Sequence, residues 1–193
     1  MNLSDVRAVV TGGVSGLGFA VAQHIVRHGG KAALFDINDD KAASALAELG
    51  GDTAAYYKTD VSDEAQVASH MQKAKEFMGG LNVAINCAGI LGAGRVLGRE
   101  ASMPLNQFAT TVKVNLIGSF NVAKAAAELM QHNAPGEDGE REDDHRAGLT
   151  MRSLTCGGRR PAATRSHHSC AKWVGATWRI PPSGAPANAA SSA

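Results

Sequence analysis

The chain has 193 residues, enough for one domain with a buried core, and its 19 Lys+Arg nearly balance its 18 Asp+Glu. That balance argues against a protein that works as a whole through the field of a nucleic acid or an anionic membrane. Three scattered cysteines are too few for a disulfide scaffold, no apolar run is long enough to span a membrane, and the start carries no secretory leader, so we expect a cytoplasmic protein.

Strand and helix patterns alternate along the chain up to about residue 132. The predicted strands cover residues 6–11, 31–36, 54–59 and 81–86. The predicted helices run from a glycine-rich turn to Gly29-Gly30, from a cap at Asp39 to Leu49, from a cap at Ser62 or Asp63 to Phe77, and from Pro104 to about Met130 with a break near 115–118. This alternation predicts an α/β fold, a Rossmann-type doubly wound parallel sheet, truncated after the fourth strand and its following helices.

The composition changes after residue 135. From His145 to Ala193 there are seven Lys or Arg, no Asp or Glu, and only five larger aliphatic side chains. Such a segment cannot bury enough apolar surface to offset the entropy of ordering it. We therefore expect a folded domain at 1–135 and a mostly disordered tail at 136–193.

A glycine-rich segment, Thr11-Gly12-Gly13-Val14-Ser15-Gly16-Leu17-Gly18, joins the first strand to the first helix. Gly12 allows a sharp turn, Gly16 lets the backbone approach a pyrophosphate, and Gly18 allows close helix–strand packing. The anion would lie at the helix N-terminus, where free N–H groups and the helix dipole favour it. A plain glycine-rich turn is the alternative, but the position between a strand and a helix favours a dinucleotide site.

Asp36 ends the second strand, 18 residues after Gly18. A carboxylate there can accept hydrogen bonds from an adenosine ribose and would repel a 2′-phosphate. No Arg or Lys lies in the glycine-rich segment or directly after Asp36, which favours NAD over NADP. The alternative is that Asp36 only caps a loop.

Two further strand ends carry short motifs. Asp60-Val61 closes the third strand, and Asn86-Cys87-Ala88-Gly89 closes the fourth. In a doubly wound sheet, the carboxyl ends of the strands line the cofactor crevice. Each motif alone is an ordinary turn, but their order supports a binding role, with Cys87 as a small packed residue rather than a reactive thiol.

Together with Val114-Asn115-Leu116-x-Gly118, these motifs resemble the short-chain dehydrogenase/reductase family. Within it, the glycine-rich segment, Phe120-Asn121-Val122 and residues 133–141 are similar to the type-2 3-hydroxyacyl-CoA dehydrogenases, also described as type-10 17β-hydroxysteroid dehydrogenases. The similarity covers about residues 1–141. It implies NAD-dependent hydride transfer between a secondary alcohol and a ketone, most closely with a 3-hydroxyacyl-CoA, in a homo-oligomer whose helices around Phe108 to Met130 pack against a partner subunit.

The resemblance also implies roles for individual residues. Ser15 and Leu17 would contact the pyrophosphate, Asp36 the adenosine ribose, Asp60 and Val61 the adenine, and Cys87, Ala88 and Gly89 the nicotinamide ribose. Asn115 would hold the water of a proton relay.

The family's proton transfer needs a tyrosine with a lysine four residues later and a serine about 13 residues before it, and this chain has no tyrosine after Tyr57. His168 and Lys172 have the tyrosine–lysine spacing but lie in no recognisable helix. The cysteines and histidines of the tail lack zinc-site spacing, so we expect no metal. Asn115 would then be all that remains of the relay, and we expect an inactive chain with impaired assembly.

Three interpretations remain open: a dehydrogenase by descent, an NAD-binding or interaction module without catalysis, and a non-functional product. The Arg-, Ala-, Pro- and Gly-rich tail is typical of GC-rich DNA translated out of frame. We therefore hypothesise a frameshift near residue 141.

Overall fold

Four short segments rich in Val, Ala, Leu and Phe form the sheet, because such side chains suit strands that are covered on both faces. The computed structural model describes residues 2–92, 94–99 and 101–134, all within the compact unit Met1–Asp143. The strands are β1 (Arg7–Thr11), β2 (Lys31–Asp36), β3 (Ala54–Lys58) and β4 (Val83–Asn86). The helices are η1 (Leu3–Asp5), α1 (Gly16–Arg27), α2 (Asp39–Leu49), α3 (Glu64–Met78), α4 (Leu105–Val112), the π-helix η2 (Lys113–Gly118) and α5 (Ser119–Met130).

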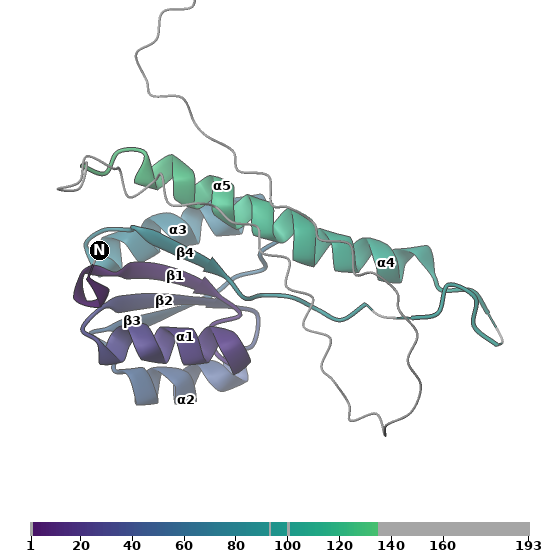
Figure 1. The fold of residues 1–193 in the computed structure, drawn as a ribbon, viewed down its shortest axis with the longest axis horizontal. Coiled ribbons are helices and arrows are strands. Elements are labelled where there is room, and N and C mark those ends of the chain that lie inside the picture. The colour runs from purple at the N-terminus through teal and green to yellow at the C-terminus, as the bar shows by residue number, and fades with distance from the viewer. Residues whose placement is uncertain (1, 93, 100, 135–193) are drawn as a thin grey trace, which may run out of the picture. The chain divides into compact units, whose positions relative to one another are not determined.

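The sheet is parallel throughout and has the strand order β3-β2-β1-β4. Helices α1 and α2 cover one face, and α3 and α5 cover the other (Figure 1). The predicted doubly wound, Rossmann-type parallel sheet is confirmed. The predicted tail at 136–193, including His168 and Lys172, lies outside the described residues.

Each face of the sheet has its own core, because alternate residues of a strand point to opposite faces. On one face, Val9 and Phe35 pack with Met71 of α3. On the other, Leu34 packs with Ile25 of α1. Fully burying a side chain of this size contributes about 1.5–3 kcal/mol, so the two cores together fix the sheet and hold the carboxyl ends of β1, β2 and β4 at one edge.

The helix caps follow the sequence closely, with one correction. Asn38 caps α2, since its side-chain oxygen accepts a hydrogen bond from the Lys41 N–H at 3.2 Å. The prediction that Asp39 caps this helix was wrong because Asp39 is already helical and its carboxylate bonds to other groups. Asp63, one of the two predicted caps of α3, accepts from the Gln66 N–H at 3.0 Å and is confirmed.

Three predicted strands are shorter than expected at one end. β1 begins at Arg7, one residue after the predicted start. β4 begins at Val83 rather than residue 81. Just before it, the Asn82 N–H donates to the Arg7 carbonyl at 3.1 Å, while the Asn82 side-chain oxygen accepts from the Arg7 N–H at 2.7 Å and its side-chain nitrogen donates to the Asp5 carbonyl at 2.9 Å. β3 ends at Lys58, one residue before the predicted end.

The predicted break near residues 115–118 is a π-helical turn instead. η2 carries the chain from α4 into α5 without interruption. A Cβ on Gly118 would lie 2.6 Å from Cγ2 of Val61, so only glycine lets the turn approach the loop after β3 this closely. The buried Asn121 amide donates to the Val61 carbonyl at 2.9 Å and fixes α5 at the same place.

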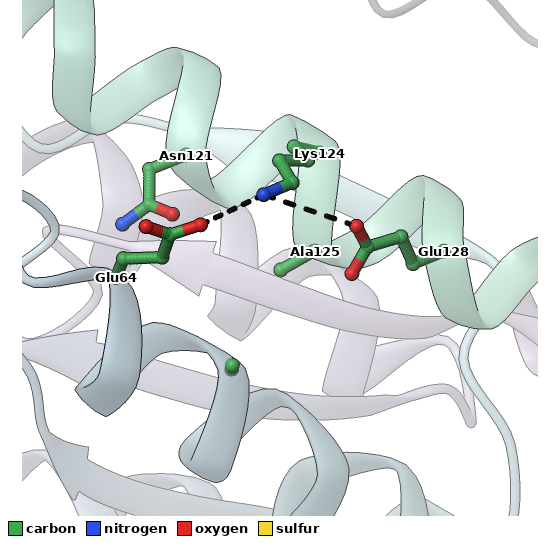
Figure 2. A pocket seen from close by; sticks show the side chains of 6 residues that line it. Glu64, Asn121, Lys124, Ala125 and Glu128 are labelled. Atoms are coloured by element: carbon green, nitrogen blue, oxygen red, sulfur yellow. Dashed lines mark hydrogen bonds and ion pairs between the residues drawn. The ribbon is translucent and has the colours of Figure 1, made fainter.

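An ion-pair group also joins α5 to α3. Lys124 lies between Glu64 and Glu128 beside a small hollow (Figure 2), with its Nζ 2.7 Å from Glu64 Oε1 and 4.0 Å from Glu128 Oε1. These side chains are exposed, so the pairs add little stability, and the buried contacts of α5 hold the helix.

None of the helices in the described residues has the length and apolar character needed to cross a membrane.

Candidate cofactor site at the carboxyl edge of the sheet

The glycine-rich segment turns sharply between β1 and α1. Gly12 has a φ of 64°, and its N–H donates to the Phe35 carbonyl at 2.8 Å. A Cβ on Gly12 would lie 3.0 Å from the Cys87 and Ala88 backbone, and one on Gly18 would lie 2.3 Å from the Gly12 carbonyl oxygen. Two of the glycines are therefore required for packing of the backbone itself.

Gly16 has the opposite environment. It is the first residue of α1 with a φ of 55°, and no described atom lies within 4 Å of where its Cβ would be. Ser15 precedes it as the cap residue, but in the described chain its hydroxyl makes no capping hydrogen bond, and the first turn of α1 contains no acidic residue. Leu17 is 63% exposed. The open N-terminus of this helix suits an anion.

Asp36 lies beside this helix start, at the end of β2. One carboxylate oxygen accepts from the Asn38 N–H at 3.0 Å, and the other accepts from the Val14 N–H at 3.4 Å. An ionised carboxylate has about four acceptor positions, so these two bonds leave room for the hydroxyls of a ribose. The bond to Val14 also ties Asp36 to the glycine-rich segment.

Asp60 and Val61 follow β3. The Asp60 carboxylate accepts from the N–H and the hydroxyl of Ser62, at 2.9 and 2.7 Å, which closes the turn into α3. The Val61 side chain is buried in the core beside Gly118. The side chain of Val61 is therefore occupied by packing, whereas the Asp60 carboxylate lies at the surface.

The segment after β4 is held by a residue whose role the sequence did not reveal. The hydroxyl of Thr11, 1% exposed, accepts from the N–H groups of Cys87 and Ala88 at 3.1 and 3.0 Å. Asn86 donates from its side chain to the Ser119 carbonyl at 3.2 Å. Burial raises the pKa of the Cys87 thiol, which fits a packed residue rather than a reactive one.

Asn115 fixes the next part of the same segment. Its amide oxygen accepts from the Ile90 N–H, and its amide nitrogen donates to the Ile90 carbonyl, both at 2.9 Å. Its own carbonyl accepts from the Ser119 hydroxyl at 2.8 Å. A Cβ on Gly89 would be 3.4 Å from the Asn115 amide oxygen, so Gly89 lies directly against this amide.

Gly13 is a second residue whose role sequence reasoning did not find. A Cβ there would lie 2.8 Å from the Val10 carbonyl oxygen and 3.0 Å from the Leu34 side chain. Its position next to Gly12 gave no indication that β2 packs against it.

The predicted site residues thus lie along one edge, linked by hydrogen bonds from β1 to β2 and from β1 to the segment after β4. The sequence model of the short chain dehydrogenase family matches residues 7–137 of this chain. The chain belongs to this family.

Several proteins of known name are similar to this chain. The 3-hydroxyacyl-CoA dehydrogenase type-2 of Drosophila melanogaster is 35% identical over 136 residues, which are 69% of this chain and 53% of the relative. The Homo sapiens protein of that name is 37% identical over 69% of this chain and 52% of the relative. Momilactone A synthase of Oryza sativa subsp. japonica is 38% identical over 64% and 44% of the respective chains.

Solved structures give the same assignment. A short-chain dehydrogenase/reductase from Brucella melitensis has a TM-score of 0.59 and 26% identity, over 67% of this chain and 55% of that one. A short-chain type dehydrogenase/reductase from Mycobacterium ulcerans has a TM-score of 0.58 and 30% identity, over 67% and 48%. The chain spans about half the length of the curated relatives that it matches.

Neither Tyr56 nor Tyr57 has the surroundings that proton transfer by a phenol requires. The Tyr56 hydroxyl lies 2.8 Å from Asp39 Oδ1 and 3.1 Å from the Asp36 carbonyl oxygen, and burial together with Asp39 raises its pKa. The Tyr57 hydroxyl donates to the Lys73 carbonyl, and burial raises its pKa also. A phenol that acts as a base near neutral pH needs a lowered pKa, so both tyrosines are structural.

Proposed function

We propose that this chain binds NAD at the carboxyl edge of its sheet. The observation that carries the proposal is the pairing of an open, acid-free N-terminus of α1 with a carboxylate, Asp36, that keeps free acceptor positions. The residues present fit the cofactor, since Gly16 leaves space where a pyrophosphate must approach. When bound, NAD would supply the hydride acceptor of the family's reaction.

Each predicted residue has a task in this proposal. Gly12 and Gly18 shape the turn, while the backbone N–H groups near Ser15, Gly16 and Leu17 hold the pyrophosphate. Asp36 accepts the ribose hydroxyls and repels a 2′-phosphate.

The remaining contacts come from the ends of the outer strands. Asp60 and the Val61 backbone lie beside the adenine, and the segment 86–89, fixed by Thr11 and Asn115, lies beside the nicotinamide ribose.

The reaction that we propose by descent is hydride transfer between NAD and a secondary alcohol or ketone, with a 3-hydroxyacyl-CoA as the small-molecule substrate. The names of the relatives support this class. This chain has no tyrosine beyond Tyr57, so we propose that it does not complete the reaction alone and that Asn115 is what remains of the relay.

A second candidate function follows from the same observation. A chain that keeps the cofactor edge and has no proton-transferring tyrosine would act as an NAD-binding or interaction module. The non-functional frameshift product is the third possibility, and the composition of residues 145–193 supports it. The nucleotide sequence of codons 136–145 tests it: an uninterrupted frame that recurs in close relatives would exclude a frameshift.

Partners and location complete the proposal. The exposed apolar side chains Leu105, Phe108 and Phe120 on α4 and α5 support association with a second copy of the chain. The balanced charge supports neither nucleic acid nor membrane as a partner, and the few cysteines support a cytoplasmic location.

Calorimetric titration of the full chain with NAD and NADP tests the binding proposal. We expect NAD to bind more tightly by about 10- to 100-fold, because NADP loses the ribose–carboxylate bond and meets like charge at Asp36. Asp36→Ala should narrow this gap. Equal or tighter binding of NADP to the native chain would refute the role of Asp36.

An assay of NAD-linked oxidation of 3-hydroxybutyryl-CoA separates the enzyme from the module. We expect binding without turnover. Measurable turnover would contradict the proposal that the chain is inactive alone.

A further inference from the structure

Lys58 lies beside Asp36, the residue that we propose to distinguish a ribose hydroxyl from a 2′-phosphate. Asp36 and Lys58 are register partners on the parallel strands β2 and β3. Partners in a parallel ladder point to the same face, so both side chains lie on the face covered by α1 and α2. Lys58 is 64% exposed in its side chain and would offer a cation next to the ribose-binding carboxylate.

Asp39 takes up this cation. Its Oδ2 forms an ion pair with Lys58 Nζ, and its Oδ1 accepts from the Tyr56 hydroxyl at 2.8 Å. These two hydrogen bonds hold the pKa of Asp39 below its usual range, so the carboxylate stays ionised at neutral pH. Tyr56 also reaches the Asp36 carbonyl oxygen at 3.1 Å, which links the ion pair to the backbone of the selecting residue.

A shallow hollow directly after Asp36 is lined by Ile37, Asn38, Asp39 and Asp40. The strand register keeps the backbone of Lys58 beside Asp36, and the ion pair with Asp39 holds its ammonium group.

We propose that Asp39 is a second determinant of the preference for NAD over NADP, acting by pairing with Lys58 and so withholding a cation from the 2′-phosphate. Asp36 rejects the phosphate directly, whereas Asp39 is a positioning residue that works through Lys58. The inference rests on the proposed NAD binding and names how that site distinguishes its two dinucleotides.

The test compares NAD and NADP affinities of full-length variants by calorimetric titration. Asp39→Asn and Asp39→Ser both free Lys58, and Asn38 keeps its cap of α2 in each. We expect the NADP-to-NAD affinity ratio to rise about fivefold, the size of one exposed charge interaction, and to fall again with added salt. Asp40→Asn is the matched control, because it removes the same charge at the neighbouring residue. The Asp40 side chain forms no ion pair among the described residues. The NADP-to-NAD affinity ratio of Asp40→Asn should differ from that of the native chain by less than about twofold.

Substitution of Lys58, alone and together with Asp39, completes a double-mutant cycle. Lys58→Met alone should leave the ratio within about twofold of the native chain, because Asp39 already occupies the ammonium. In Asp39→Asn/Lys58→Met the rise in the NADP-to-NAD affinity ratio should disappear. In Asp39→Asn/Lys41→Met the rise should persist, because this variant removes a different lysine, on α2.

The outcomes separate this inference from the proposed function. If the native chain binds NAD but Asp39→Asn and Asp40→Asn shift the ratio equally, or the gain survives Lys58→Met, the role of Asp39 is overturned and NAD binding stands. If the native chain binds neither dinucleotide, the proposed function fails and this inference fails with it.

Discussion

Two regions of the chain are built differently. One is the carboxyl edge of the sheet, formed by the ends of β1, β2 and β4 with the start of α1, and the other is the helical surface, formed by α4, η2 and α5. At the edge, backbone groups of one strand bond to the next, as in the pair Gly12–Phe35, and Thr11 joins β1 to the segment after β4. On the helical surface, α4 has no buried residue, and Phe108 and Phe120 are 56% and 63% exposed.

The two regions differ in where their contacts come from. Contacts among neighbouring strands and the segment after β4 shape the edge. An exposed apolar surface of this kind is typical of an interaction site, because water contact with large apolar side chains is unfavourable. Cofactor binding and self-association should therefore respond to different substitutions.

The largest effect should come from disturbing the backbone contact at the edge. In Gly18→Ala the new methyl group would lie 2.3 Å from the Gly12 carbonyl oxygen, so the turn must shift. We expect a loss of about 3 kcal/mol in the free energy of unfolding, measured in urea, together with loss of NAD binding. Gly51→Ala is the control, since no described atom lies within 4 Å of its added Cβ. Equal stability of the two variants would show that the edge is not close-packed.

Thr11→Val tests the clamp between β1 and the segment after β4. The substitution keeps the side-chain shape but leaves the Cys87 and Ala88 N–H groups without their acceptor. We expect a loss of about 2 kcal/mol in stability and weaker NAD binding. Thr110→Val, at an exposed position of α4, should cost less than about 0.5 kcal/mol. A Thr11→Val chain as stable as Thr110→Val would mean that the clamp is dispensable.

Phe108→Ser/Phe120→Ser should affect the helical surface alone. Removing two exposed rings should weaken self-association about tenfold in sedimentation experiments and leave NAD affinity unchanged. Leu3→Ser, which removes an exposed apolar side chain outside this surface, should change neither property. If the double substitution instead lowered NAD affinity, the two regions would not be independent.

The smallest effect concerns pH. Burial lowers the pKa of His70, whose Nδ1 lies 2.9 Å from the Thr59 hydroxyl oxygen. The folded chain therefore binds fewer protons at this site than the unfolded chain, and stability falls as the pH drops from about 6.5 toward the lowered pKa. His70→Asn should reduce this slope in thermal melts. Above about pH 8, where the imidazole is neutral in both the folded and the unfolded chain, the two proteins should have the same slope, and an unchanged slope just below about pH 6.5 would contradict the assignment.

Sequence reasoning predicted the strands, the glycine-rich turn and a cap of α3 at Ser62 or Asp63, because each depends on neighbours within a few residues. A buried strand such as β2 has its apolar run, and Gly12 and Gly18 have the spacing that a strand–turn–helix unit requires. The strand ends that line the candidate site follow from the parallel order alone, so Asp36 and residues 86–89 could be placed at one edge before any coordinates were known.

Contacts between distant segments could not be predicted in this way. Asn38 caps α2, whereas the Asp39 carboxylate pairs with Lys58 on β3. The expected break in the last helix is a π-turn, where Gly118 packs on Val61. In the sequence, Thr11 is only the last residue of a mostly apolar strand. Its role is seen when the segment after β4 lies against it and donates two hydrogen bonds to its hydroxyl.

The sequence by itself therefore determined the order of strands and helices, the position of the glycine-rich turn and the carboxylate at the end of β2, since local hydrogen bonding and hydrophobic period specify these. The tertiary structure decided which polar groups meet across the sheet edge: Thr11 with the amides after β4, Asn115 with Ile90, and Asp39 with Lys58. Such pairs join residues far apart in the chain, and their partners are fixed only when packing sets the register and depth of each element.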